Sequence, residues 1–465
     1  MKFPSSQHAP TKLKSTAAVQ SIIKHFTEQV DQEEAFYVCN LNDIIERHDL
    51  WKYYLPNVVP YYAVKCHDDK HVLEVMTNKG INFDCASRGE INKVLSVGCS
   101  TDRIIFANPA KPIGHIRFAA EVGVNTMTFD NESELVKIQK VYPSASLVIR
   151  IRCDATDAVC PLGMKFGCDP VKEAPRLLRL AESLNLNVIG VSFHVGSGCR
   201  EPEVFWRAIS EARNIFNYAS TLGYKFTLLD IGGGYPGGHG TSIKKIAGIV
   251  NNALDKYFND LPDVKFIAEP GRYFVTSAYT LTCNIYSIRN VFDENNNEIT
   301  HKMYYVNDGV YGSFNCILYD HRTVDPIPLS KNPDLENTKH VSSSIWGPSC
   351  DGLDQLVEDM ELPDLEVGDW IVFEDMGAYT LCAASPFNGF PIPKVHYCIT
   401  QNEWLKVKDT LSLPKAKLII IDEKATGPDL DAEEAAFESA YDKCCPIENS
   451  GKIIETLHQL VDVAV

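Results

Sequence analysis

Residues 228–238 read LLDIGGGYPGG, and this stretch indicates the architecture of the chain more clearly than any other. An apolar run typical of a buried strand ends at Asp230, and Gly232, Gly233 and Gly234 follow almost at once. Because glycine lacks a Cβ, its backbone adopts positive φ and lets a ligand approach closely. Successive N–H groups in such a turn form a nest for an anion such as phosphate. A turn of this kind is either a plain tight turn or an anion site, and the other strand ends decide between them.

Similar apolar or β-rich runs recur throughout the first 272 residues. They occupy residues 58–65, 81–86, 103–108, 125–130, 146–151, 188–195, 226–233 and 264–271. Segments with helical periodicity lie between the runs, for example residues 201–223. Runs with little polar alternation suit strands that are buried on both faces. About eight strand–helix units in succession predict an α/β fold, a closed parallel (β/α)8 barrel of the TIM type.

The pattern changes after Arg272. β-rich segments with turns between them continue to about residue 422, helical patterns become few, and residues 293–299 (DENNNEI) have the composition of a hairpin tip. We therefore expect an antiparallel β domain after the barrel. The predicted parts are an N-terminal segment, 1–35, packing on the β domain; a barrel, 36–272; the β domain, 273–422; and an acidic tail, 423–465, part helical and part disordered.

Composition and charge narrow the class of function. The net charge of −17 disfavours nucleic acids and anionic membranes as partners and leaves small cationic substrates open. The 15 cysteines show no CxxC spacing, so we expect neither a zinc site nor a disulfide framework. The N-terminal residues lack the apolar core of a signal peptide, and no run approaches transmembrane length. These features predict a cytoplasmic protein with reduced thiols.

Polar or ionisable groups stand at the end of each predicted barrel strand. They are Lys65, Asp84, Asn108, Asp130, Arg150, His194, the glycine turn, and Glu269 with Arg272. Taken singly, the lysine suits a solvated surface, the histidine a structural place in an apolar run, and Glu269 with Arg272 a simple ion pair. A barrel places its active site at the C-terminal ends of its strands, where these groups would meet.

Together these groups suit pyridoxal phosphate as cofactor, with no metal. A lysine amine forms a Schiff base with the cofactor aldehyde, and an amino-acid substrate displaces it. A carboxylate facing the pyridine nitrogen keeps the ring protonated and therefore an electron sink. The glycine turn and an arginine hold the phosphate by charge-assisted hydrogen bonds, while an imidazole stacks on the ring.

Eight motifs then carry a resemblance to a known family. They are YYAVKC, FDCAS, SFHVGSGC, DIGGGYPG, AEPGRYF, NDGVYGSFNCILYDH, WGPSCDGLD and FEDMGAYT. In unbroken order over roughly residues 35–395, they resemble the eukaryotic ornithine decarboxylases, pyridoxal-phosphate enzymes of the alanine-racemase-like fold group. The resemblance implies a homodimeric lyase that converts L-ornithine to putrescine and carbon dioxide in polyamine biosynthesis. It also places the first β segment, near residues 35–40, in the second domain.

The resemblance implies roles for individual cofactor-binding residues. Lys65 would be the Schiff-base lysine, His194 would stack on the ring and Glu269 would meet the pyridine nitrogen. The implied phosphate ligands are Ser197, Gly234, Arg272 and Tyr379. The remaining cofactor-binding positions are Asp84, Arg150, Gly232, Gly233, Pro270 and Gly271, with Glu90 nearby in support.

The resemblance also implies a substrate site that two subunits share. Tyr311, Tyr319, Asp320 and Asp351 would contact the substrate. Cys350 and Asp351 would enter from the partner subunit, Cys350 donating a proton and Asp351 pairing with the distal amine. From the residues alone, Asp320 and Asp351 also suit a turn and a helix N-cap, and Cys350 a buried core thiol. A distal cation in a desolvated pocket would equally need such carboxylates.

Several positions depart from the family pattern and leave other functions open. His67 stands where the family usually has asparagine, and Ala110 stands where it usually has cysteine. Arg152 and Cys153 change the sequence that follows Arg150. Such changes could alter rate or substrate preference. One alternative is decarboxylation of lysine or another basic amino acid. Another is an inactive binding protein like antizyme inhibitor, and an antizyme-type regulator is a further candidate partner.

Overall fold

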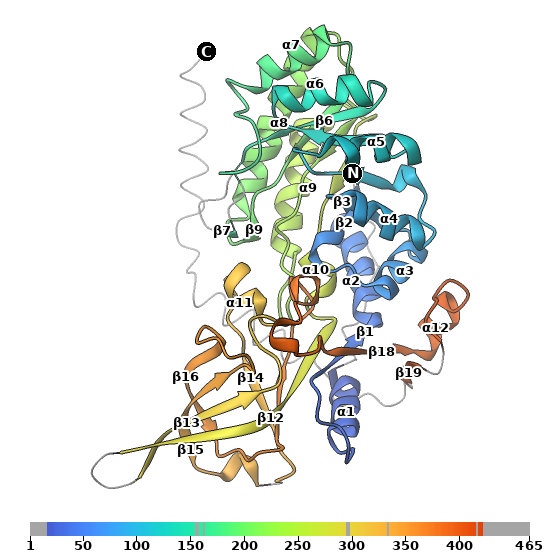
Figure 1. The fold of residues 1–465 in the computed structure, drawn as a ribbon. Helices are drawn as coiled ribbons and strands as arrows, with labels where there is room; N and C mark the ends of the chain where they lie inside the picture. The colour runs from blue at the N-terminus through green and yellow to red at the C-terminus, as the bar shows by residue number, and fades with distance from the viewer. Residues whose placement is uncertain are drawn as a thin grey trace. The chain divides into compact units, whose positions relative to one another are not determined.

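Eight strands among the described residues close a parallel barrel, in the order β10-β11-β2-β3-β4-β5-β6-β8 (Figure 1). The computed structural model describes residues 16–153, 158–160, 163–293, 298–332, 334–414 and 417–421. The barrel strands are β2 (Val58–Ala63), β3 (Asn82–Cys85), β4 (Ile104–Phe106), β5 (Thr126–Phe129), β6 (Ser146–Ile151), β8 (Asn187–Phe193), β10 (Leu228–Asp230) and β11 (Lys265–Ala268). Seven of them lie within predicted runs and β8 begins one residue before its run, 188–195, so the predicted barrel is confirmed.

The barrel has a packed interior and a coat of helices. Tyr61, Ile105, Val148 and Ile267 belong to an apolar cluster contributed by strands around the barrel. The helices are α2 (Leu41–Tyr54), α3 (Lys70–Asn78), α4 (Arg88–Ser96), α5 (Ile113–Val122), α6 (Glu132–Val141), α7 (Ala174–Ser183), α8 (Glu203–Thr221) and α9 (Lys244–Phe258). Since both strand faces are covered, the barrel sequences show little polar alternation.

Side-chain caps explain where several of these helices begin. Asp69 accepts the backbone N–H groups of His71 and Val72 at the start of α3. Ser87 and Asn131 cap α4 and α6 in the same way. A cap satisfies an N–H group that the first turn of a helix leaves unpaired. The strand ends are therefore followed by sharp, well-defined turns.

The second sheet is mixed, so the predicted antiparallel β domain needs correction. Its path is β16-β15-β13-β12-β1-β18-β19, with β17 pairing with β12 and β14. β1 pairs antiparallel with β12 but parallel with β18, and β13 and β15 are also parallel. Parallel pairs need long crossovers, and the whole barrel lies in sequence between β1 and β18. The members are β1 (Phe36–Asn40), β12 (Tyr279–Phe292), β13 (Ile299–Val306), β14 (Pro326–Leu329), β15 (His340–Trp346), β16 (Gln355–Pro363), β17 (Trp370–Phe373), β18 (Lys394–Thr400) and β19 (Leu418–Ile421).

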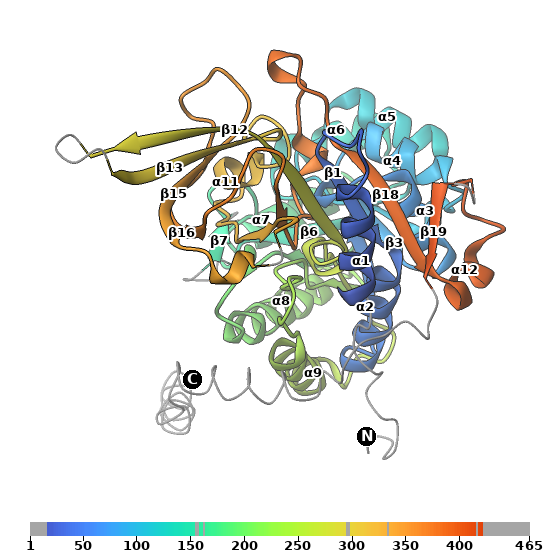
Figure 2. The same ribbon diagram turned by 90° about the horizontal axis from the view of Figure 1, so that it is seen from below.

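The N-terminal elements belong to this sheet and not to the barrel. β1 falls at the start of the range 36–272 that was assigned to the barrel, yet it lies between β12 and β18. α1 (Thr16–Thr27) lies alongside β1 (Figure 2), where Val19 and Ile23 pack against Phe36 and Trp370. The barrel therefore begins after β1, with α2.

The two remaining boundary predictions, the hairpin tip and the acidic tail, concern residues that lie outside the described part of the chain. Phe292 of β12 pairs with Ile299 of β13, as a hairpin requires, but residues 294–297 at its tip lie outside the described residues. The predicted acidic tail, 423–465, also lies outside them. Within the described part of the chain, no helix combines the length and apolar character needed to cross a membrane.

Candidate active site

Lys65 stands directly after β2 and reaches the mouth of the barrel. Its Nζ forms an ion pair with Asp84 of β3, which is fully buried, whereas the Lys65 side chain is 39% exposed and so accessible to a ligand. Burial lowers the pKa of Lys65, but the carboxylates of Asp84 and Glu269 outweigh it and the net shift is upward. Burial also raises the pKa of Asp84 to about 7. An amine held between carboxyl groups is thus offered at the end of the barrel.

His194 follows β8 and presents a neutral imidazole. Its Nδ1 accepts the N–H of Gly196 at 3.0 Å. Burial, followed by the nearby cations Arg150, Lys65 and Arg272, holds the pKa of His194 well below its ordinary range. A Cβ added to Gly233 would lie 2.6 Å from His194 Nε2. The ring therefore lies against the glycine turn with no room for a side chain there.

The glycine turn needs its glycines for backbone conformation and for close approach. Gly232 and Gly234 have φ values of +64° and +112°. A Cβ on Gly232 would stand 2.1 Å from the carbonyl oxygen of Phe193. A Cβ on Gly234 would stand 2.9 Å from the carbonyl oxygen of Gly196. The turns after β8 and β10 thus pack backbone to backbone, in a conformation that suits a phosphate.

Three of the predicted phosphate ligands meet next to this turn. Arg272 donates to Ser197 Oγ from Nη2 at 2.7 Å and from Nε at 3.0 Å. The Arg272 guanidinium also lies over the ring of Tyr379, at 5.1 Å. Tyr379 has a φ of +55°, and its N–H donates to the carbonyl of Cys66, the residue after Lys65. A guanidinium, a hydroxyl and a phenol therefore converge close to the lysine.

Glu269 ends β11 and lies deep in the site. It is 7% exposed, and burial followed by the proximity of Asp230 raises its pKa well above the ordinary range. Arg150, which is also buried, lies over the ring of Phe166 at 5.3 Å. Sequence reasoning gave Asp230 no role. The sequence feature that could have drawn attention to Asp230 is its position as a carboxylate at a strand end, directly before the glycines.

The residues that follow Glu269 fix the spacing of two neighbouring strand ends. The carbonyl of Pro270 accepts the N–H of Ala63 at 3.2 Å. A Cβ on Gly271 would lie 3.0 Å from the Cβ of Cys66, next to Lys65. A larger residue at position 271 would push these two strand ends apart. Glu90 supports the same end of the barrel by accepting the N–H of Ala86 at 2.6 Å.

Asp320 joins the site from the second domain, whereas the side chain of Tyr319 beside it is mostly exposed. Asp320 follows α11 (Asn315–Tyr319), is 8% exposed and accepts a hydrogen bond from Arg272 Nη2 at 2.8 Å. The neighbouring Tyr319 is 73% exposed. The predicted substrate carboxylate therefore lies at the barrel mouth, while the tyrosine beside it faces outward.

Tyr311, Cys350 and Asp351 form a second, exposed cluster. The Tyr311 hydroxyl donates to the Asp351 carboxylate, which lowers the pKa of Asp351. The Tyr311 ring stacks on Phe387 with centroids 4.1 Å apart. Cys350 is exposed and donates its N–H to Asn388 Oδ1 at 3.0 Å, so it is not a core thiol. No contact recorded for the described residues joins this cluster to Lys65 or the glycine turn of the same chain.

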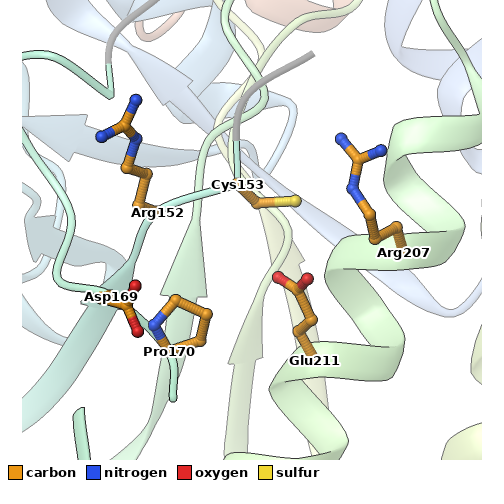
Figure 3. Close-up of a pocket in the computed structure, with 6 residues that line it drawn as sticks. All are labelled: Arg152, Cys153, Asp169, Pro170, Arg207 and Glu211. Carbon is orange, nitrogen blue, oxygen red and sulfur yellow. The ribbon is translucent and has the colours of Figure 1, made fainter. Parts of the chain in front are cut away.

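Three positions that depart from the family pattern have different surroundings, and one of them, His67, follows Lys65 by two residues. His67 is buried, and its ring is 4.3 Å from that of Tyr279. Arg152 and Cys153 line a hollow of about 320 Å³ with Asp169, Pro170, Arg207 and Glu211. Figure 3 shows Cys153 pointing toward α8, the helix that carries Arg207 and Glu211. The hollow contains none of the predicted site residues.

The residues at the barrel mouth fit pyridoxal phosphate. The glycine turn is a cradle that added Cβ atoms would fill, and an arginine and a serine hydroxyl stand beside it. A neutral ring, an accessible amine and a buried carboxyl group complete the donors that such a cofactor needs. Among the described residues no three His, Cys, Asp or Glu side chains gather as a metal site would require.

Comparison with known proteins agrees with this assignment. Residues 41–276 match the family described as pyridoxal-dependent decarboxylase, pyridoxal binding domain. Ornithine decarboxylase of Mus musculus is 49% identical over 392 residues, 82% of this chain and 84% of that protein. Antizyme inhibitor 2 of Xenopus laevis is 48% identical over 387 residues, with the same coverage of 82% and 84%. The structure of the Paramecium bursaria Chlorella virus arginine decarboxylase bound to agmatine superposes with a TM-score of 0.76 and 37% identity, covering 82% of this chain and 99% of that one.

Proposed function

This chain belongs to the pyridoxal-dependent decarboxylase family that includes the ornithine decarboxylases, and on that premise we propose that it converts L-ornithine to putrescine and carbon dioxide. The observation that carries the proposal is the convergence at one barrel end of an accessible lysine, a neutral imidazole, a glycine cradle and a buried carboxyl group. These are Lys65, His194, residues 232–234 and Glu269.

The barrel mouth would bind and orient the cofactor. Bound pyridoxal phosphate supplies an electron sink for the pair left behind when a carboxylate departs as carbon dioxide. Lys65 would hold the cofactor aldehyde through its amine, while Asp84 keeps that amine at the mouth. His194, neutral and packed against the glycine turn, would stack on the ring. Glu269 would meet the ring nitrogen, with Arg150 nearby to favour its anionic form.

The phosphate would be held where the glycine turn meets Arg272. The guanidinium already lies at hydrogen-bond distance from Ser197 and over the ring of Tyr379. Charge-assisted hydrogen bonds from a guanidinium to a phosphate are among the stronger polar contacts in proteins. Gly233 and Gly234 would add backbone N–H groups, while Gly232, whose N–H donates to Asp230 Oδ1 at 2.9 Å, would shape the turn. Pro270 with Gly271 would keep the strand ends together.

Carboxylates on two surfaces would select a cationic substrate. Asp320 lies at the barrel mouth with Arg272 and would receive the distal amine of ornithine, beside Tyr319. The exposed cluster of Tyr311, Cys350 and Asp351 would enter the site of a second copy of the chain. There Asp351 would pair with the same amine, and Cys350 would donate a proton to the substrate's Cα.

A homodimer with shared sites accounts for the composition of that exposed cluster. Leu353, which is 66% exposed, and Phe387, which is 42% exposed, add apolar surface beside Cys350 and Asp351. Apolar and aromatic side chains are typical of interface cores, whereas an isolated reactive thiol is not typical of a free surface.

Because the proposed product is putrescine, a diamine, we assign the enzyme to polyamine biosynthesis in the cytoplasm, where that product would be used.

Two other functions compete with this one. The arginine decarboxylase similarity supports the same chemistry on a longer basic amino acid. The antizyme inhibitor similarity supports a binding protein that meets an antizyme-type regulator. Visible absorbance of the purified chain after addition of pyridoxal phosphate separates an enzyme from such a binder, with Lys65→Ala as control. Product analysis with ornithine, lysine and arginine then identifies the substrate, and absence of bound cofactor would contradict the enzyme.

A further inference from the structure

The loop of residues 235–239, which continues the glycine turn, is bound by a side chain of the second domain. Asp375, in the segment after β17, accepts the backbone N–H of His239 with both carboxylate oxygens, Oδ1 at 3.0 Å and Oδ2 at 3.1 Å. Its Oδ1 also lies 2.7 Å from Nδ1 of the His239 ring. A Cβ added to Gly238 would stand 2.8 Å from Asp375 Oδ2. The carboxylate therefore lies directly against the backbone of a barrel loop.

The same loop passes closely over Arg272, one of the expected phosphate ligands. A Cβ on Gly237 would stand 1.9 Å from the carbonyl oxygen of Arg272. Arg47, a buried residue of α2, donates to the carbonyl of Gly237 at 3.1 Å. The barrel thus binds a carbonyl of the loop, whereas the N–H group of His239 is bound by Asp375. Both contacts fix the course of the chain that leaves the glycine turn.

Asp375 also begins the segment that carries Tyr379, another expected phosphate ligand. The N–H of Met376 donates to the carbonyl of Tyr279 at 2.8 Å, and the N–H of Tyr379 donates to the carbonyl of Cys66 at 3.0 Å. Asp375 and Tyr379 have φ values of +60° and +55°, which residues other than glycine rarely adopt. Surrounding contacts must therefore hold this segment in its conformation, and the position of Tyr379 is tied to that of Asp375.

We propose that Asp375 is a positioning residue for the phosphate of the cofactor, because its carboxylate joins the loop after the glycine turn to the segment that carries Tyr379. The two parts of the phosphate site come from different domains, and this contact keeps their separation constant. The inference rests on the proposed function, since the phosphate belongs to the cofactor assigned there.

The charge on Asp375 strengthens the contact. Burial acts to raise the pKa of Asp375, but its hydrogen bonds and charge interaction with His239, followed by the charge of Arg322, outweigh burial, and the net pKa is lowered. Arg322 also donates to the backbone carbonyls of Glu374, at 3.2 Å, and of Asp375 itself. The carboxylate is therefore anionic at neutral pH, and hydrogen bonds to an anionic acceptor are stronger than those to a neutral one.

Glycine at position 375 removes the carboxylate without straining the backbone. Because glycine adopts positive φ freely, Asp375→Gly keeps the backbone conformation and loses the side-chain contacts with His239. Asp375→Asn is the conservative variant, since its amide oxygen still accepts the His239 N–H. Asn185→Gly is a matched control: Asn185 also has a positive φ, +52°, but it is exposed and precedes β8, at the end of the barrel away from the mouth.

The test compares the dissociation constants of pyridoxal phosphate and of pyridoxal, which lacks the phosphate, on the full chain freed of cofactor. We expect the unaltered chain to prefer pyridoxal phosphate. Asp375→Gly should lower that preference by about tenfold, while Asp375→Asn and Asn185→Gly should keep it within about twofold. A merely structural role would weaken binding of both ligands equally and leave the preference unchanged.

Gly238→Ala reaches the same contact from the loop. Its Cβ would displace the Asp375 carboxylate, so the preference should fall in the same direction, by about threefold or more. This variant decides the question if Asp375→Gly does not fold.

The contradicting outcomes are separable. An unchanged preference in Asp375→Gly, or in Gly238→Ala where it is the variant that decides, would overturn the role of Asp375 while leaving the proposed function intact. A loss in Asp375→Asn or Asn185→Gly as large as that in Asp375→Gly would overturn the role in the same way. If the unaltered chain binds neither ligand, the cofactor assignment itself fails.

Discussion

The Nε2 atom of His194 lies 2.6 Å from the position that a Cβ on Gly233 would occupy. No real Cβ approaches a nitrogen that closely, so any side chain at position 233 must displace the imidazole. The imidazole that would stack on the cofactor is therefore packed directly against the turn that would hold the cofactor's phosphate.

Gly233→Ala should weaken cofactor binding by shifting His194. Overpacking of this kind costs about 1–3 kcal/mol, so we expect the dissociation constant of pyridoxal phosphate to rise about tenfold. Fluorescence titration of the cofactor-free chain measures it. Gly248→Ala on α9 is the control, because a Cβ there meets no atom within 4 Å and should leave binding unchanged. Equal affinity of both variants would contradict the fit of His194 to the turn.

Arg272→Gln should reduce affinity for the phosphorylated cofactor selectively. The guanidinium would lose its charge-assisted contacts, and we expect about a tenfold to hundredfold rise in the dissociation constant of pyridoxal phosphate. Binding of pyridoxal, which lacks the phosphate, should change little. Arg213→Gln removes a comparable arginine, which pairs with Asp260 through two hydrogen bonds of 2.7 and 2.8 Å on the surface. Equal weakening of both ligands by Arg272→Gln would count against a phosphate role.

Mixing two inactive variants should restore activity if the sites are shared between subunits. Lys65→Ala damages the barrel side of a site, and Asp351→Ala damages the side expected from the partner. Random reassociation makes half of the dimers mixed, each with one intact site, so activity should reach about a quarter of the unaltered level. Decarboxylation is assayed after the two variants are dissociated and remixed. A mixture as inactive as its components would contradict the shared site.

The ion pair of His239 with Asp375 should make stability depend on pH. His239 Nδ1 lies 2.7 Å from Asp375 Oδ1. Burial lowers the pKa of His239, but its hydrogen bond and charge interaction with Asp375 outweigh it, and the net pKa is raised. Because the pKa of His239 is higher in the folded chain than in the unfolded chain, the ion pair stabilises the fold fully at pH values below the ordinary histidine pKa. This stabilisation is lost as the pH rises through the raised pKa.

His239→Gln should therefore cost about 1 kcal/mol of unfolding free energy in mildly acid solution, and progressively less as pH rises. Urea titrations at several pH values measure the difference from the unaltered chain. In an Asp375→Asn background the pH dependence of this difference should disappear. A difference that grows with pH would show that the histidine is not stabilised in its charged form.

The barrel and its strand-end residues could be predicted because both follow from local patterns. Buried parallel strands read as continuous apolar runs, and all eight runs became barrel strands. Because parallel strands end at the same rim, Lys65, His194 and Glu269 had to come together once the barrel was inferred. The glycine turn was visible because only glycine tolerates such backbone proximity.

Long-range relationships were less accessible. Nothing in the local pattern of β1 shows that it pairs with β18, some 350 residues later, and parallel pairing of β13 with β15 depends on a crossover that periodicity does not reveal. The hydrogen bond from the Glu269 N–H to the Gly232 carbonyl depends on two strand ends being neighbours in the closed barrel. Tyr319 is 73% exposed while the adjacent Asp320 is buried, a difference that the sequence pattern alone does not reveal.

Release of carbon dioxide from carboxyl-labelled ornithine tests the central claim most directly. The full chain, supplied with pyridoxal phosphate, is compared with Lys65→Ala and with Lys79→Ala, a control lysine that pairs with Glu403 at 2.8 Å. We predict release that depends on ornithine, persists in Lys79→Ala and is lost in Lys65→Ala, with labelled lysine and arginine as weaker substrates. A chain that binds the cofactor yet releases carbon dioxide from none of the three amino acids would contradict the account.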